Sequence, residues 1–210
     1  MNETAGFLRR YFGVVAREET YLNLIYLVLA FPLGTVYFVF LVTGLSVGIG
    51  TAIIWIGIPI LLAVFAASWG LAMFERMLAE VLLREDIAPM SRQEDAETSA
   101  WERLKAHLGN RVTWTSLVYL FLKFPIATLF FTIAVTVVAT AVAMLIAPFI
   151  YKLWDYPSWW GIWQVDTLGE ALIATVLGLV IVGPISLHIT NFLAWVSGTF
   201  ARVMLGRLED

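Results

Sequence analysis

A repeated segment limits the fold of this chain more than any other feature of its sequence. Residues 24–38 and residues 117–131, which lie 93 positions apart, carry the same amino acid at eight of fifteen positions. The shared residues include a Tyr-Leu pair, a Phe-Pro pair and the threonine three positions after the proline. Each copy opens an apolar stretch long enough to enter a bilayer. The sequence therefore predicts two fused copies of one membrane hairpin.

The composition places these hairpins in a membrane. Of the 210 residues, 60% are hydrophobic and 14% are charged, whereas an ordinary soluble domain has roughly 25% charged residues. A soluble protein of this size could not bury so much apolar surface, so lipid must cover the remainder. The sequence has no cysteine for a disulfide or a thiolate metal site, and two histidines are too few for a multi-histidine site. We therefore expect no metal and no cofactor.

Four apolar blocks give the expected membrane crossings, at about residues 22–43, 51–74, 117–150 and 171–196. A turn rich in glycine and serine, residues 44–50, separates the first two blocks. Block three is too long for one straight crossing, and Pro125 inside it lacks the N–H that a helix needs. We expect residues 114–124 to form an interfacial or kinked segment before this proline. By the repeat, residues 21–31 behave in the same way before Pro32, which would lengthen the first crossing and shorten its turn. The sequence leaves both versions open.

The basic residues orient the crossings. Eleven of the thirteen Lys and Arg residues lie before the first block, between blocks two and three, or after block four. The positive-inside rule makes that side cytoplasmic, so we expect a multi-pass protein of the plasma membrane with both termini in the cytoplasm. Aligning Gly57 with Gly183 extends the repeat, more faintly, to the second helix of each hairpin. Since both copies enter from the cytoplasm, we expect a parallel repeat and an all-α, four-helix bundle with pseudo-twofold symmetry.

Residues 1–210 are expected to form a single membrane domain. Its first repeat, cytoplasmic link and second repeat cover about residues 21–83, 84–113 and 114–206. Apolar residues at helical spacing predict that the second crossing continues into the cytoplasm as an amphipathic helix; they are Phe74, Met77, Leu78, Val81 and Leu82. Further along the link, residues 86–97 are expected to form a loop. Ser99 followed by Glu102 is a capping-box pattern and predicts that a helix restarts there.

The two copies differ most in the segment between blocks three and four, which this topology places outside the cell. The segment carries four of the nine tryptophans and has no counterpart in the first hairpin. One interpretation is an aromatic belt at the headgroup level. The other is an exterior ligand platform, with contacts from Trp154, Asp155, Tyr156, Trp159, Trp160, Trp163, Asp166 and Glu170.

Polar residues inside the apolar blocks are the other candidates. Lys123 lies near the cytoplasmic end of block three, where its side chain is expected to reach the headgroups. His188 lies near the middle of block four, with Asn191 on the same helical face at i+3. This pair is either a sensing or proton-handling site or a structural hydrogen-bonded contact between helices. Its expected partners follow one face of block three at i, i+4 and i+8; they are Thr132, Thr136 and Thr140.

No residue pattern in the sequence is typical of a catalytic site. The sequence has no His-Glu-x-x-His, no Gly-x-x-x-x-Gly-Lys phosphate loop and no Gly-x-Ser-x-Gly elbow. No pair of carboxylates or metal ligands is visible within the apolar blocks. We therefore expect a protein that is not an enzyme and name no catalytic residue.

Ordered elements of the apolar blocks resemble a known family. They are residues 26–38 with Phe-Pro, 44–48 with Gly-Leu-Ser, 56–61 with Gly-Ile-Pro and 74–76 with Phe-Glu-Arg. In this order they resemble the "putative sensor" membrane domain, which precedes the kinase core in some bacterial histidine kinases and also occurs alone, notably in archaea. The resemblance covers roughly residues 20–206. It implies an input domain of signal transduction and brings no catalytic residues with it.

The sequence reaches Asp210 with no room for a phosphoacceptor helix or an ATP-binding domain. We expect either a piece of a longer protein or a sensor and signalling accessory that acts through a separate protein. Such a sensor would detect an external or lipid-phase stimulus and pass it to a cytoplasmic partner through about residues 75–111. The alternatives are a small transporter or channel subunit, a structural scaffold and a membrane enzyme acting on lipids. The expected partners are the lipid bilayer, a cytoplasmic signalling protein and a second copy in a homodimer, with no nucleic acid.

Overall fold

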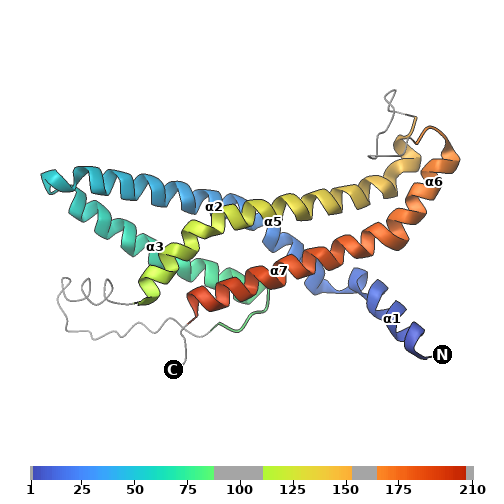
Figure 1. Ribbon diagram of the computed structural model, residues 1–210, viewed down its shortest axis with the longest axis horizontal. Coiled ribbons are helices and arrows are strands. Elements are labelled where there is room, and N and C mark those ends of the chain that lie inside the picture. The colour runs from blue at the N-terminus through green and yellow to red at the C-terminus, as the bar shows by residue number, and fades with distance from the viewer. Residues whose placement is uncertain (1, 88–110, 153–164, 207–210) are drawn as a thin grey trace. The chain divides into compact units, whose positions relative to one another are not determined.

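The computed structural model describes residues 2–87, 111–152 and 165–206, and every regular element in these residues is helical. The α-helices are α1 (Asn2–Gly13), α2 (Glu18–Thr51), α3 (Gly57–Leu82), α5 (Arg111–Ile150), α6 (Leu168–Leu177) and α7 (Gly183–Leu205) (Figure 1). Three short segments complete the set: the 3-10 turns η1 (Val14–Ala16) and η2 (Ala52–Ile54), and the π-helical η3 (Gly178–Val182), which joins α6 to α7. The all-α prediction is confirmed.

Four helical stretches are long and apolar enough to cross a membrane: Glu18–Ile54, Gly57–Leu82, Trp114–Ile150 and Leu168–Leu205. The chain is therefore a multi-pass membrane protein, and the predicted four crossings are found within the residues that the structure describes. The parallel direction of the two hairpins and the cytoplasmic location of both termini stay predictions.

The observed helices are longer than the apolar blocks of the sequence. α5 has 40 residues, which at 1.5 Å per residue is about 60 Å, roughly twice the hydrocarbon thickness of a bilayer. Residues 114–124 are continuous with the rest of α5 across Pro125, and residues 21–31 are continuous with α2 across Pro32. The segments before the two prolines are thus parts of the long helices. Each long helix must therefore tilt steeply or extend beyond the hydrocarbon core.

The turn of the first hairpin lies later than the glycine- and serine-rich segment that was expected to form it. Residues 44–50 are helical, and η2 with the two residues after it makes the turn instead, so the longer version of the first crossing is the one observed. Two of the three glycines in this segment, Gly44 and Gly48, act in helix packing. A Cβ on Gly44 would lie 2.6 Å from Cγ2 of Val64, and one on Gly48 would meet the side chain of Leu61. Their absence of side chains lets α2 and α3 approach closely.

The helices divide into two compact units, which are described separately. The first unit contains Met1–Leu24 and Thr132–Leu193, and the second contains Ile25–Phe131 and Ala194–Asp210. In the first unit, α5 packs beside α6 around buried Ala147, Val165, Ala171 and Ala174. The Thr175 hydroxyl donates to the backbone oxygen of Met144 at 3.2 Å, which ties the two helices together.

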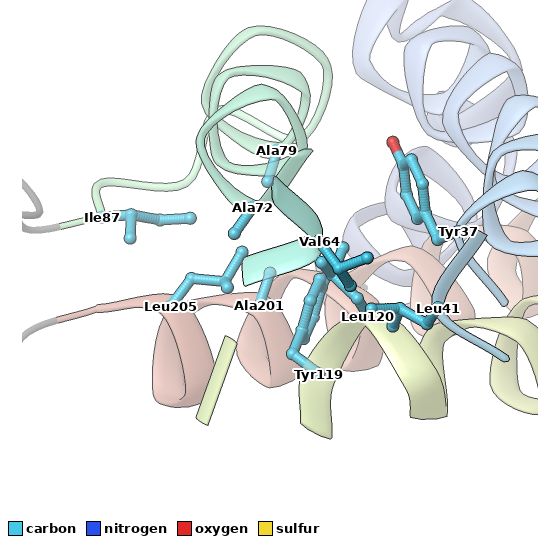
Figure 2. Packing of buried hydrophobic residues seen from close by; sticks show 10 residues of the cluster. All are labelled: Tyr37, Leu41, Val64, Ala72, Ala79, Ile87, Tyr119, Leu120, Ala201 and Leu205. Carbon is cyan, nitrogen blue, oxygen red and sulfur yellow. The ribbon is translucent and has the colours of Figure 1, made fainter. Parts of the chain in front are cut away.

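The core of the second unit is made by α2, α3, α5 and α7 (Figure 2). Its buried residues are Tyr37, Leu41, Val64, Ala72, Ala79, Ile87, Tyr119, Leu120, Ala201 and Leu205. Alanines on α3 and α7 allow close packing, which matters because lipid supplies no hydrophobic drive for helices to associate. Gly34 serves the same purpose between α2 and α5, since a Cβ there would lie 3.1 Å from the Cα of Phe124.

The predicted continuation of the second crossing as a helix is confirmed as far as Leu82. The buried face of this helix follows small residues and one carboxylate: Ser68, Ala72, Glu75 and Ala79. The large apolar residues Met77 and Val81 are exposed instead. The loop predicted over residues 86–97 begins as non-helical chain up to residue 87. Its remainder and the predicted helix at Ser99 lie outside the described residues.

Candidate functional site

Lys123 on α5 is buried in the second unit and does not reach the headgroups. Its side chain is 5% exposed, and that of its partner Glu75 on α3 is 0% exposed. The expectation that Lys123 extends to the bilayer surface is therefore wrong. The physical reason is the carboxylate, because Lys123 Nζ lies 2.9 Å from Glu75 Oε2. An ion pair at this distance offsets part of the large cost of removing both charges from water.

Two tyrosines complete what we call the lysine cluster, which consists of Glu75, Lys123, Tyr26 and Tyr119. Lys123 Nζ donates to the hydroxyl oxygen of Tyr26 at 2.6 Å and to that of Tyr119 at 3.4 Å. The Tyr119 hydroxyl in turn donates to Glu75 Oε2 at 3.1 Å. Lys123 Nζ also lies 4.5 Å from the centre of the Tyr26 ring, within the range of a cation–π interaction. The three donors of the ammonium group thus have three oxygen acceptors.

The internal repeat explains why tyrosines lie on both sides of Lys123. Tyr26 and Tyr119 occupy the same position in the two copies, one on α2 and one on α5. Lys123 follows Tyr119 by one helical turn at i+4, so both side chains lie on the same face of α5. Gly34 keeps the backbone of α2 close to α5, because a Cβ there would lie 3.3 Å from the carbonyl of Lys123. The tyrosine of α2 can therefore reach the ammonium group.

The ion pair itself does not follow the repeat. The alignment of the first helices matches Lys123 with Ala30, and that of the second helices matches Glu75 with Ala201. Both alanines are buried. One copy thus supplies the acid and the other supplies the base. The ion pair between Glu75 and Lys123 joins the first repeat, through α3, to the second repeat, through α5.

The lysine cluster is incompletely hydrogen-bonded. Glu75 Oε1 is buried and has no hydrogen-bond partner among the residues described, and the same is true of the hydroxyl of Tyr37, which is not a member of the cluster. A buried polar atom without a partner costs about 1–3 kcal/mol, and more when it is charged. Partly satisfied polar networks in a low dielectric are energetically sensitive to small movements. The geometry therefore suits a contact between helices that a modest change in packing can weaken or strengthen.

The predicted exterior ligand platform is only partly within the described residues. Trp154, Asp155, Tyr156, Trp159, Trp160 and Trp163 lie outside them. The structure gives Glu170 a local role, because its Oε2 accepts from the backbone N–H groups of Asp166 at 2.9 Å and Thr167 at 3.0 Å. Thr167 Oγ1 accepts from the backbone N–H of Glu170 at 3.3 Å, which completes a capping box at the start of α6.

His188 and Asn191 contact different groups in the first unit. Asn191 accepts from Asn23 Nδ2 at 2.9 Å, and it donates to Thr20 Oγ1 at 3.1 Å, so it links α7 to the start of α2. His188 Nε2 lies 3.3 Å from the backbone oxygen of Tyr11 on α1. Asn191 therefore fits the structural interpretation of the pair. A sensing role for His188 stays a prediction.

The threonine face of block three does not supply the partner that the structure gives to His188. Thr132 and Thr136 are exposed in the first unit, and the Thr140 hydroxyl donates to the backbone oxygen of Thr136 within the same helix at 2.8 Å. A hydroxyl bonded to its own helix needs no partner on another one. Among the residues described, no group of three or more histidine, aspartate and glutamate side chains could hold a metal ion.

Sequence reasoning missed Glu75, Tyr26 and Tyr119 as members of a site. A signal was present, because the repeat keeps a polar tyrosine hydroxyl at the same position of both apolar copies. Lys123 and Glu75 are also opposite charges beside long apolar stretches. What the sequence did not give was the packing of α3 against α5, which brings the two charges together.

Comparison with known proteins identifies one family. The family described as "Sensor: Putative sensor" matches residues 26–205, which include every member of the lysine cluster. No curated protein and no solved structure matches the chain.

Proposed function

We propose that this chain is a membrane sensor which passes a change in helix packing to a separate cytoplasmic protein. The premise is that the chain belongs to the "Putative sensor" family. The observation that carries the proposal is the buried ion pair between Glu75 and Lys123. This contact joins the two repeats, and a stimulus that changes the packing of α3 on α5 could break or form it. The protein so proposed acts by binding and relay and catalyses no reaction.

The energetics of the ion pair support a relay. Removing one partner of a buried pair leaves an uncompensated charge and costs about 3–5 kcal/mol, whereas replacing both partners can be nearly neutral. The contact is thus either made well or strongly avoided, as a two-state element requires. A stimulus shifts such an equilibrium only if it interacts differently with the two states. We propose that an external or lipid-phase stimulus does so by changing how α3 packs on α5.

The neighbourhood of Glu75 offers a route towards the cytoplasmic link. Arg76, the next residue, donates from Nη2 to the backbone oxygen of Ile87 at 2.7 Å, so the chain beyond α3 is held by the turn that carries Glu75. Arg202 near the end of α7 forms an ion pair with Glu85, with Nη1 of Arg202 3.4 Å from Oε2 of Glu85. A movement of this turn of α3 would therefore move the start of the link directly. We propose that the cytoplasmic partner binds within about residues 75–111.

The experiment is photo-crosslinking of the full chain in its native membrane. A photoreactive amino acid at Met77 or Val81, which are both exposed on α3, would capture a protein bound at the start of the link. Mass spectrometry then identifies the captured protein. We expect a cytoplasmic signalling protein such as a kinase or response regulator, and we expect K123A to change the yield of the cross-link.

Two variants make the test specific. The charge swap E75K/K123E keeps one acid and one base in the cluster and should restore the yield, because the tyrosine hydroxyls can rotate to donate or accept. K152A removes an exposed cation and should leave the yield unchanged. Recovery of no protein partner in the wild-type chain would contradict the sensor proposal.

The second candidate is a small transporter or channel subunit, which the same ion pair favours because ionisable residues among membrane helices often mark ion pathways. Flux measured in proteoliposomes separates the two candidates. A proton or ion flux that K123A and E75Q abolish and K152A leaves intact would favour transport. Partner capture without flux would favour the sensor.

A further inference from the structure

The first helix presents an apolar face that no described part of the chain covers. Leu8 is 52% exposed, Phe12 is 40% exposed and Val15 is 46% exposed. Their spacing of i, i+4 and i+7 puts them on one side of α1 and the turn that follows it. Arg9 and Arg10 are exposed as well: Arg9 borders this side of the helix, and Arg10 lies opposite it. An apolar face with basic residues at its border and on the opposite side is the pattern of a helix that lies in the surface of a membrane.

The contacts of Tyr11 place this helix beside a membrane helix within the first unit. The Tyr11 hydroxyl donates to the backbone oxygens of Val180 and Ile181, each at 3.1 Å. Both oxygens belong to the π-helical η3, whose wider turns are rare and frequently occur at functional sites. The rings of Tyr11 and His188 are 5.9 Å apart. Since η3 lies in the candidate span Leu168–Leu205, the residues of α1 beside Tyr11 lie next to a membrane helix.

We propose that residues 8–17 form a binding surface for anionic phospholipid headgroups. Leu8, Phe12 and Val15 enter the boundary between headgroups and acyl chains. Arg9, Arg10 and Arg17 are exposed and bind the phosphate oxygens, to which guanidinium groups donate paired hydrogen bonds. Clusters of basic residues next to a membrane helix are attracted to anionic lipids. Charge complementarity and the continuity of this face with the membrane-spanning α2 thus both point to lipid as the occupant.

This surface would supply the lipid-phase stimulus of the proposed function. In that respect the inference rests on the proposed function, although lipid binding itself does not. The link to the rest of the protein runs through Tyr11, which holds the backbone of η3, and through the contact of His188 with the Tyr11 backbone. An anionic lipid that moves α1 would therefore act directly on α6 and α7 where they join. This gives His188 a mechanical part in sensing.

The test uses a fluorescent label on α1 in the full chain. Because the chain has no cysteine, the single substitution L8C allows attachment of one polarity-sensitive fluorophore. The labelled protein is placed in nanodiscs of phosphatidylcholine alone, or of phosphatidylcholine and phosphatidylglycerol in equal parts. We expect a blue shift of the emission with phosphatidylglycerol, and a smaller shift at high salt because salt screens the arginines.

Matched variants separate lipid charge from general insertion. R9Q/R10Q/R17Q should lose the shift caused by phosphatidylglycerol, whereas R92Q/R103Q/K105Q, which removes three positive charges from the link, should keep it. An equal emission in both lipids, or a shift that survives R9Q/R10Q/R17Q, would overturn the proposal. Partner capture through α3 is measured separately, so failure of the lipid surface and failure of the sensor function give different results.

Discussion

Lys123 has its counter-charge and its hydrogen-bond acceptors inside the protein, so its removal should be costly. In K123A the Glu75 carboxylate stays buried without a base, and we expect the free energy of unfolding to fall by about 3–5 kcal/mol. Thermal unfolding of the purified protein in detergent measures this loss. The charge swap E75K/K123E should recover part of it. A K123A protein as stable as one with the exposed K152A would show that the ion pair contributes nothing.

The tyrosines of α2 offer a matched pair of hydroxyl deletions. The Tyr26 hydroxyl accepts from Lys123 at 2.6 Å, so Y26F should lower the free energy of unfolding by about 1.5–3 kcal/mol, the usual value for a hydrogen bond to a charged group. The Tyr37 hydroxyl is buried without a hydrogen bond to the described residues. Y37F should therefore lower the free energy of unfolding less than Y26F does. Equal losses in the two variants, measured by thermal unfolding, would contradict the observed network.

For individual residues, the sequence analysis did not predict the lysine cluster, although all of its members are visible in the sequence. It placed Lys123 at the cytoplasmic end of its crossing, from which a lysine can ordinarily reach the headgroups. What kept the side chain inside was Glu75, which is 48 positions away in sequence and has no pattern that connects it to α5. Ion pairs between distant segments depend on tertiary packing, and periodicity describes only one helix at a time.

Among the elements, the α2–α3 hairpin depends on a glycine at its turn. A Cβ on Gly57 would collide with the backbone of Gly48 and Ala52, and backbone atoms cannot move aside as a side chain can. We expect G57A to lower the free energy of unfolding by about 1–3 kcal/mol or more. Gly50 has nothing within 4 Å of its virtual Cβ, and G50A should stabilise α2 by about 0.5–1 kcal/mol. Thermal unfolding of the two variants should therefore shift in opposite directions, and a shift in the same direction would refute this account of the turn.

The number and type of elements could be predicted from the sequence, because long apolar stretches specify membrane helices by themselves. The residues at which the helices begin and end could not be predicted from the sequence. Residues 44–50 have the composition of a turn, yet in a membrane helix small residues also serve close packing. Gly44 lies against Val64, and only the partner helix shows which use applies. The role of Glu170 was also missed, because the sequence analysis named it as a ligand contact and the structure shows it in the capping box at the start of α6.

For the whole molecule, the asymmetry of the lysine cluster says how two copies came to act as one protein. If each copy carried both the lysine and the glutamate, two equivalent ion pairs could form, and the charges would not distinguish one copy from the other. With alanine at the two matching positions, Ala30 and Ala201, only one arrangement of unlike copies satisfies both charges. Buried polar groups that fix the register of helices are well attested in this role. The ion pair between Glu75 and Lys123 therefore determines which helices of the two repeats pack together, and it also stabilises that packing.

The orientation of the two hairpins is the prediction that most affects any account of signalling. The distribution of basic residues predicts that both turns face outwards and that the link faces the cytoplasm. The chain has no cysteine, so single substitutions at the first turn, after α5 and in the link give unambiguous labels. Suitable variants are I53C, whose parent residue is 87% exposed, K152C and S99C.

In intact cells a membrane-impermeant maleimide should label I53C and K152C, and it should reach S99C only after the membrane is opened. Labelling of I53C and K152C from opposite sides would mean an inverted repeat, because the two turns would then face opposite solutions. In that case Glu75 and Lys123 would approach each other from opposite sides of the membrane. The contact between Glu75 and Lys123 would then depend on how deeply each hairpin is inserted in the membrane. It would no longer support a relay through one cytoplasmic link.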